Sequence, residues 1–230
     1  KNKSKVDYNF DDNIFRFNLL DMSSVPKFNL EGEIKLKPFI TNFTGNINKV
    51  NLSDLLYSNS FIIQFLKTEI LNNKNLTSEA NIKFKKILPY RSFNDLSVNF
   101  RIKEGLIDVD DTKFNWLNSI SFNLVDSLVY LKNNNLVLDG KLILDIFDYD
   151  EIYKSFQTPR NYRSELKNVE VDFIYNFDQQ IINFSNLRID GKLNQNINEI
   201  LKEFVLKETS LQNKIHLKNL INKAIKSYAG

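Results

Sequence analysis

Polar and apolar residues alternate along most of this chain. In residues 28–36, 76–84 and 169–177, every second position is apolar or small, and the positions between them are mainly polar or charged. Because successive side chains of a strand point to opposite sides, a period of two predicts strands with one apolar face and one polar face. The pattern therefore predicts a large β sheet that is apolar on one side.

A five-residue pattern of apolar residue, acid, glycine, charge and apolar residue occurs three times within the alternating stretches. It is found at residues 30–34, 138–142 and 189–193, with Gly32, Gly140 and Gly191 at its centre. Glycine inside a strand marks a bend, a bulge or the close approach of another group. Bends or bulges that let a long sheet coil are the favoured interpretation, and contact with a ligand is the alternative.

The alternation changes to a helical pattern in three places. Between residues 51 and 72, and again in residues 193–230, apolar residues recur every three or four positions. A third, short helix is expected after Asp148, because acids favour the positive end of a helix. Within the last segment, Ile215 and Leu217 flank His216 in a brief alternation that predicts a short strand with His216 on its surface.

These patterns predict a single elongated domain of the mainly β class. We expect an antiparallel sheet with short helices and a C-terminal amphipathic helix, divided into strands (1–50), a helical insert (51–72), a β-rich body (73–192) and a helical cap (193–230). No linker rich in proline, glycine or serine separates these parts.

Composition excludes several functional classes. The net charge is only +3, with 31 basic and 28 acidic residues mixed along the chain, so nucleic acid is not an expected partner. There is no cysteine, which excludes disulfides and thiolate chemistry. The sequence lacks the common nucleotide-binding, serine-hydrolase and zinc-protease motifs, and His216 is its only histidine. We therefore predict a protein without catalytic residues, resident metal or cofactor.

Two clusters of acids offer the oxygen ligands that a hard cation prefers. One contains Asp108, Asp110 and Asp111, and the other lies at residues 145–151. Neither has the spacing of a twelve-residue calcium loop, and helix capping accounts for the second. A cation site remains the lesser alternative at both.

The C-terminal segment is basic on one side and apolar on the other. From residue 211 onward it contains lysines and no acid, with Lys218, Lys223 and Lys226 opposite an apolar stripe. Such a helix can lie on an anionic membrane surface. It can equally cover the apolar end of the sheet, and this packing alternative is favoured.

Several stretches resemble the C-terminal region of the AsmA-like family of bacterial envelope proteins. They are the run from Phe100 to Asp110, the run from Leu136 to Leu142 with the Asp148 helix after it, and residues 175–178. Residues 52–56 are similar to the helical insert of that family. The resemblance extends from about Leu76 to the end and is looser before it.

The resemblance implies a sheet coiled into a taco-like groove with an apolar interior. It also implies a periplasmic protein, anchored to the inner membrane through a segment outside this chain, that supports phospholipid transport between the two membranes. What it carries over to this sequence is a row of groove residues: Leu30, Ile34, Ile82, Phe84, Phe100, Ile102, Phe122, Leu138, Leu142, Phe173 and Tyr175.

Two functions follow as hypotheses. In the first, the groove shields lipid acyl chains and phospholipid is the partner, with a membrane surface or envelope proteins as further partners. In the second, the chain is a non-enzymatic assembly module of the cell envelope whose apolar face is closed by its own helices. An enzyme acting on glycans or lipids is a third and weaker alternative.

Overall fold

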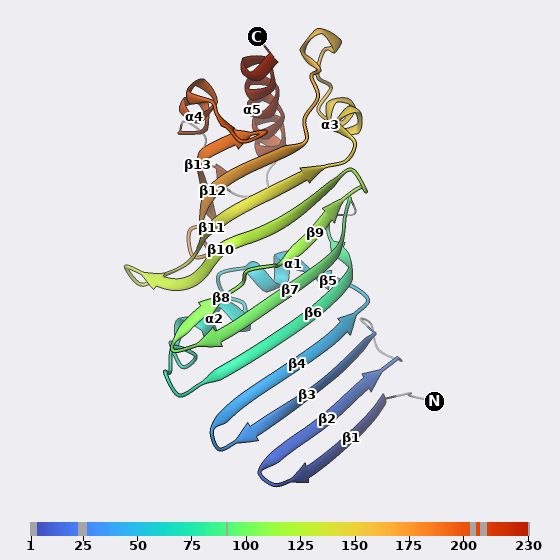
Figure 1. The fold of residues 1–230 in the computed structure, drawn as a ribbon, viewed down its shortest axis with the longest axis vertical. Helices are drawn as coiled ribbons and strands as arrows, with labels where there is room; N and C mark the ends of the chain where they lie inside the picture. The colour runs from blue at the N-terminus through green and yellow to red at the C-terminus, as the bar shows by residue number, and fades with distance from the viewer. Residues whose placement is uncertain (1–3, 23–26, 91, 203–205, 208–210, 230) are drawn as a thin grey trace.

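The computed structural model shows one large, curved β sheet, with helices on one of its faces (Figure 1). It describes residues 4–22, 27–90, 92–202, 206–207 and 211–229. The N-terminal strands form one end of the elongated molecule, and the last helices form the other. The mainly β class expected from the alternation is confirmed.

The strands follow one another across the sheet in nearly sequential order. Their bounds are β1 (Ser4–Asp11), β2 (Ile14–Asp21), β3 (Phe28–Leu36), β4 (Phe39–Ile47), β5 (Val50–Asn51), β6 (Thr77–Leu88), β7 (Phe93–Lys103), β8 (Leu106–Asp108), β9 (Lys113–Trp116), β10 (Ile120–Lys132), β11 (Asn135–Ile146), β12 (Asn168–Asn176), β13 (Ile181–Ile189), β14 (Lys192–Leu193) and β15 (Leu206–Lys207).

The helices lie between strands or at the C-terminal end. They are α1 (Leu52–Leu56), α2 (Phe61–Lys67), α3 (Tyr149–Ser155), a 3-10 turn (Arg160–Tyr162), α4 (Gln195–Lys202) and α5 (Leu211–Ala229). The Ser60 hydroxyl caps α2 by accepting a hydrogen bond from the Ile63 amide, and Asp148 caps α3 by accepting one from the Glu151 amide. The helical insert and the helix after Asp148 are therefore confirmed.

The first four strands form an antiparallel meander in which each strand pairs with the next. The turn between β1 and β2 has positive φ at both Asp12 and Asn13, residue types that tolerate this conformation. Among the described residues, β1 pairs only with β2 and so forms one edge of the sheet.

One junction in the sheet differs from the antiparallel arrangement that we expected. Strand β6 lies parallel to β4, with Ile40 opposite Thr77 and Ile47 opposite Phe84. Two neighbouring parallel strands need a crossover connection, and β5, α1 and α2 supply it. This crossover places α1 and α2 over the middle of the sheet (Figure 1).

From β6 onward the sheet is antiparallel again, and its hairpins agree with the sequence. The turn between β10 and β11 has positive φ at Asn133 and Asn134, as their residue type predicts. The hairpin of β12 and β13 is confirmed as well. The strand expected around His216 is wrong, because residues 211–229 form the single helix α5.

The hydrophobic core consists of three clusters, all beneath helices. One lies under α1 and includes Phe84 and Leu96, the second lies under α2 and includes Ile102 and Leu136, and the third lies under α3, α4 and α5. The core therefore occupies the middle and the C-terminal end of the sheet.

Candidate apolar binding face

The strand registers place the apolar residues of neighbouring strands on the same side of the sheet, which we call the apolar face. Leu30 of β3 lies opposite Gly45 of β4, and Gly45 lies opposite Ile82 of β6. In the second half, Leu138 lies opposite Val129 on one side and Tyr175 on the other. The single apolar face expected from the alternation is therefore present on both sides of the parallel junction.

All eleven residues of the expected groove row lie on this face, but most are covered. Phe84 is buried in the cluster under α1, with Ile82 packed against that cluster. The cluster under α2 contains Ile102, and three further members of the row, Phe100, Leu138 and Tyr175, pack against it. Burial raises the pKa of the Tyr175 phenol, in keeping with an apolar environment.

The other five residues of the row differ in what covers them. Phe122 stacks on Phe114 with ring centroids 4.6 Å apart. Phe173 is buried, and Leu142 packs against the C-terminal cluster. Only Leu30 and Ile34 belong to strands that contribute no residue to any of the three clusters.

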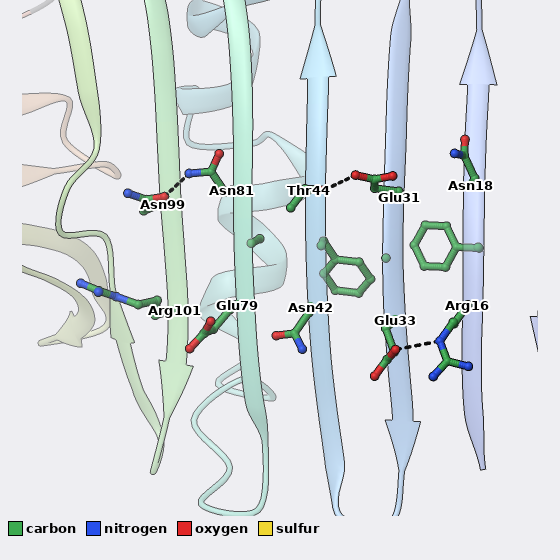
Figure 2. Close-up of a pocket in the computed structure, with 14 residues that line it drawn as sticks. Arg16, Asn18, Glu31, Glu33, Asn42, Thr44, Glu79, Asn81, Asn99 and Arg101 are labelled. Carbon is green, nitrogen blue, oxygen red and sulfur yellow. Dashed lines mark hydrogen bonds and ion pairs between the residues drawn. The ribbon is translucent and has the colours of Figure 1, made fainter. Parts of the chain in front are cut away.

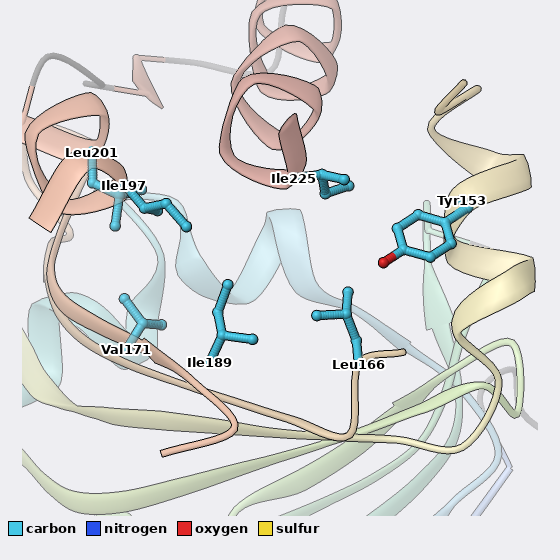
Figure 3. Packing of buried hydrophobic residues seen from close by; sticks show 7 residues of the cluster. All are labelled: Tyr153, Leu166, Val171, Ile189, Ile197, Leu201 and Ile225. Atoms are coloured by element: carbon cyan, nitrogen blue, oxygen red, sulfur yellow. The ribbon is translucent and has the colours of Figure 1, made fainter. Parts of the chain in front are cut away.

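At the C-terminal end, helices lie over the apolar face (Figure 3). Ile197 and Leu201 of α4 and Ile225 of α5 pack against Val171 and Ile189 of the sheet. The exposed fraction of Ile197 and of Tyr153 is 0%. The apolar stripe of α5 is thus engaged with the sheet.

The lysines of α5 are held close to the neighbouring segments. Lys226 lies over the ring of Tyr162, 5.4 Å from its centroid, and Lys218 donates a hydrogen bond to Gln157. Lys223 is exposed on the same helix and also makes an interaction within the protein. Because the stripe that would enter a membrane packs inside the protein, the geometry favours packing over membrane binding for this helix.

Strands β1 to β4 present their apolar residues without such a cover, except at Ile47, which packs against the cluster under α1. Among the described residues, no hydrophobic side chain of these four strands is buried. We call this part of the sheet the open apolar face; its residues are Val6, Tyr8, Phe10, Phe15, Phe17, Leu19, Phe28, Leu30, Ile34, Leu36, Phe39, Phe43 and Ile47. Val6, Tyr8 and Phe10 are the most exposed of them, at 64%, 73% and 58%.

A series of aromatic rings crosses the open apolar face from β1 to β4. The centroids are 6.2 Å apart for Tyr8 and Phe15, 5.9 Å for Phe15 and Phe17, and 5.8 Å for Phe17 and Phe43. The last pair closes over Gly32, where an added Cβ would lie 2.5 Å from the Phe43 ring and 2.9 Å from the Phe17 ring. Gly32 therefore serves close ring packing within the sheet.

The other two glycines of the repeated pattern have different roles. Gly140 lies opposite a bulge between Val125 and Leu128, and an added Cβ would lie 2.2 Å from the Ser127 hydroxyl. The bulge predicted from the pattern is thus present at Gly140. Gly191 lies outside the strands, in the turn between β13 and β14 with φ of +76°, so its placement within a strand was wrong.

The opposite face of β2 to β7 is polar and forms a shallow depression of about 660 Å³. Figure 2 shows its side chains in two rows that cross the strands. Arg16 pairs with Glu33 at 2.9 Å, the Thr44 hydroxyl donates to Glu31 at 3.0 Å, and Asn81 donates to Asn99. These groups satisfy one another, and none is arranged as a nucleophile with a base.

The first acid cluster is likewise engaged with protein groups. Arg101 lies 3.1 Å from Asp108, and the hydrogen bond with Asp108 raises the pKa of the guanidinium. Burial raises the pKa of Asp110, against the lowering effect of its hydrogen bond from the Ser127 amide. In the part of the chain that the structure describes, no group of three or more potential metal-ligating side chains is present.

Comparisons with protein-family models, curated proteins and solved structures found no match to this chain. The family resemblance of the sequence therefore stays a prediction. Within the described ranges, no helix is both long and apolar enough to cross a membrane.

Most residues of the open apolar face were not among the expected groove residues. Only Leu30 and Ile34 were, and residues 4–11 were assigned to the strand region 1–50 without a groove residue. The signal was present, because Val6, Tyr8 and Phe10 alternate with Asp7 and Asn9.

Proposed function

We propose that this protein is a non-enzymatic β-sheet module that shields lipid acyl chains on the open apolar face of β1 to β4. The observation that carries the proposal is the contrast in burial: the apolar face continues across the whole sheet, yet no described hydrophobic side chain of β1 to β4 is buried. Soluble proteins rarely leave a contiguous apolar area of this kind without a use for it.

The dimensions and chemistry of this face suit a linear apolar chain. Strands of eight or nine residues extend over roughly 27 to 30 Å, at about 3.3 Å per residue. Removing an acyl chain from water is worth about 0.8 kcal/mol per CH₂, or roughly 12 kcal/mol for sixteen carbons. A surface of aromatic and aliphatic side chains can recover a large part of this without recognising any headgroup.

Helix α1 borders the open apolar face at Ile47, and exposed aromatic residues follow it in the chain. Leu52 and Leu55 of α1 pack against the same cluster as Ile47 of β4. Beyond them, Tyr57 and Phe61 are 53% and 81% exposed, and Phe61 stacks on Phe65.

The helix-covered strands would then support the open apolar face without contacting lipid themselves. Residues such as Phe100 and Ile102, which the groove hypothesis placed in contact with lipid, pack beneath α2. The lipid-shielding surface is thereby limited to one end of the molecule, and the helices stabilise the other.

Two adjacent leucines on β2 provide the test. Leu19 lies on the open apolar face opposite Leu30, whereas Leu20 lies on the polar face opposite Asn29. The protein is purified from a lipid-containing host, and its bound lipid is measured by native mass spectrometry and by extraction. We expect Leu19→Asp to remove most of the co-purifying phospholipid and Leu20→Asp to leave it in place.

Thermal melts of both variants verify that each is folded. Equal loss of lipid from the two folded variants, or a wild-type protein that carries no lipid, would contradict the proposal.

The assembly hypothesis is the second candidate, and one observation favours it. The helices cover the apolar face from β6 to β13, as that hypothesis required of a closed module. A lipid-free protein that binds a folded envelope protein through β1 to β4 would support this function in place of lipid shielding.

A further inference from the structure

Strand β1 is an edge strand whose only protection against pairing is its exposed charged side chains. It is eight residues long, and the register of its pairing with β2 shows no bulge. It contains no proline, and its three apolar residues all lie on the open apolar face. Edge strands normally carry a bulge, a proline, an inward-pointing charge or charged side chains, because unpaired backbone groups form a template for another strand. Of these, β1 has only Lys5, Asp7 and Asp11, all on its polar side.

The sequence of β1 is complementary to itself when two copies run antiparallel. If Tyr8 lies opposite Tyr8, then Val6 lies opposite Phe10 and Lys5 lies opposite Asp11, so each apolar residue meets an apolar one. This register pairs residues 5–11, which is seven of the eight residues in the strand. Opposite charges directly across a strand pair are favourable, whereas like charges are unfavourable.

The other registers that keep the apolar residues together fit less well. Shifting the pairing so that Asp7 lies opposite Asp7 also pairs seven residues, but it places like charges across the two-fold axis. Registers centred on Val6 or on Asn9 pair only five residues. Parallel pairing in register would place Lys5 opposite Lys5. Charge and length together therefore select the register centred on Tyr8.

The charged ends of β1 have no polar partner on the neighbouring strand. On β2, the residue opposite Lys5 is Leu20 and the residue opposite Asp11 is Ile14, so neither charge meets a polar group there. Lys5 pairs with Asp7 of its own strand at 2.7 Å, with both side chains more than half exposed. In the described part of the chain, no ion pair reaches Asp11.

We propose that β1 is the dimerisation surface of this protein, pairing antiparallel with β1 of a second copy about a two-fold axis at Tyr8. The axis is perpendicular to the sheet, so the open apolar faces of the two copies join into one continuous surface. The inference stands on the edge strand alone and does not depend on lipid binding.

The first test is an exchange of charges. The mass of the purified chain is measured by sedimentation across a range of concentrations, where 27.0 kDa indicates the monomer. We expect Lys5→Asp and Asp11→Lys, singly, to weaken the dimer about tenfold or more, because each turns two favourable pairs into two repulsive ones. The double variant Lys5→Asp/Asp11→Lys restores opposite charges and should restore the dimer.

The rescue is specific to pairing between copies. Within one chain, residues 5 and 11 are roughly 20 Å apart along the strand, which is beyond the screening length of about 10 Å at 0.1 M salt. Lys83→Asp, an exposed change on the polar face of β6, is the control for altered net charge and should leave the dimer intact.

The second test fixes the register. Because the chain has no cysteine, a single introduced cysteine can form a disulfide only with a second copy. Tyr8→Cys should crosslink readily under mild oxidation, since position 8 meets itself. Val6→Cys should not, because its counterpart lies four residues further along the strand, roughly 13 Å away.

Three results would overturn the inference. They are a 27.0 kDa species at every concentration, a dimer that both single charge variants leave unchanged, and equal crosslinking of the two cysteine variants.

Discussion

The two ends of the sheet are built from the same alternation but differ in what covers them. On β12 and β13, Val171, Phe173 and Ile189 are buried, because α4 and α5 lie over that end. On β2 and β3, Phe17 and Leu30 occupy equivalent apolar positions, yet neither is buried. Alternation therefore specifies which side of a strand is apolar, whereas burial depends on a second layer that the strand itself does not encode.

The largest expected effect compares one leucine from each region. Leu136→Ala removes a side chain that is 1% exposed, and we expect it to lower the free energy of unfolding by about 2 to 5 kcal/mol. Leu36→Ala acts on a side chain that is 44% exposed, and its expected cost is below about 1 kcal/mol. Urea denaturation measures both. Similar costs would mean that the N-terminal face is covered in solution.

Glycine replacement should sharpen the comparison within the closed region. An added Cβ at Gly140 would meet the Cα of Ser127 at 2.9 Å, so the backbone has to move. We expect Gly140→Ala to cost about 1 to 3 kcal/mol of unfolding free energy. At Gly191 no atom lies within 4 Å, so only the positive φ penalises alanine, by about 1 kcal/mol. Chemical denaturation of the two variants gives the order, and a reversed order would contradict it.

An ion pair that holds the α2 cover predicts a pH dependence. Lys67 of α2 lies 2.6 Å from Asp178, which also accepts a hydrogen bond from the Leu136 amide. Burial alone would raise the pKa of Asp178, but these hydrogen bonds outweigh it and the net shift is downward. Stability from this group is therefore present above the ordinary carboxyl pKa and is lost as the pH falls through the lower, folded-state value.

The variant Asp178→Asn removes the carboxylate of this ion pair and tests the predicted pH dependence. At neutral pH we expect it to cost about 1 to 2 kcal/mol, since both side chains are partly exposed. Its stability should then fall less than that of the wild type between pH 5 and the acid limit. Parallel acid profiles for the two proteins, recorded by denaturation at each pH, would contradict the assignment.

The smallest effect is expected on the polar face of the open region. Arg16 and Glu33 pair at 2.9 Å with side chains 51% and 39% exposed. Pairs of this kind contribute about 0 to 1 kcal/mol, so Arg16→Ala should change the unfolding midpoint only slightly. A large loss of stability would show that the polar face contributes more than its exposure indicates.

The sequence predicts the elements well wherever their signal is local. Turn residues such as Asn133 and Asn134, and the capping acid Asp148, act on groups within a few residues of themselves. The same holds for the spacing of apolar residues in α1 and α2. The strand predicted from Ile215 to Leu217 was wrong, because three residues are too few to distinguish a period of two from one of 3.6.

The parts that could not be predicted depend on distant segments. The parallel pairing of β4 with β6 arises only once the crossover has packed over the sheet. The packing positions of α2, α4 and α5 likewise decide which of the expected groove residues stay uncovered. Phe100 and Leu30 have the same local pattern, and only the tertiary structure gives one a helix above it and leaves the other without one.

The parallel junction between β4 and β6 also separates two parts of the sheet that should differ in the free energy of local opening. Strands β1 to β4 contact mainly their immediate neighbours in sequence and bury no described hydrophobic side chain, so their opening should require less free energy than unfolding of the helix-covered sheet. Amide hydrogen exchange should accordingly become slower from β1 towards β6, with the slowest amides in β10 to β12. The N-terminal meander would then act as a separate cooperative unit that opens and recloses while the remainder of the sheet stays folded.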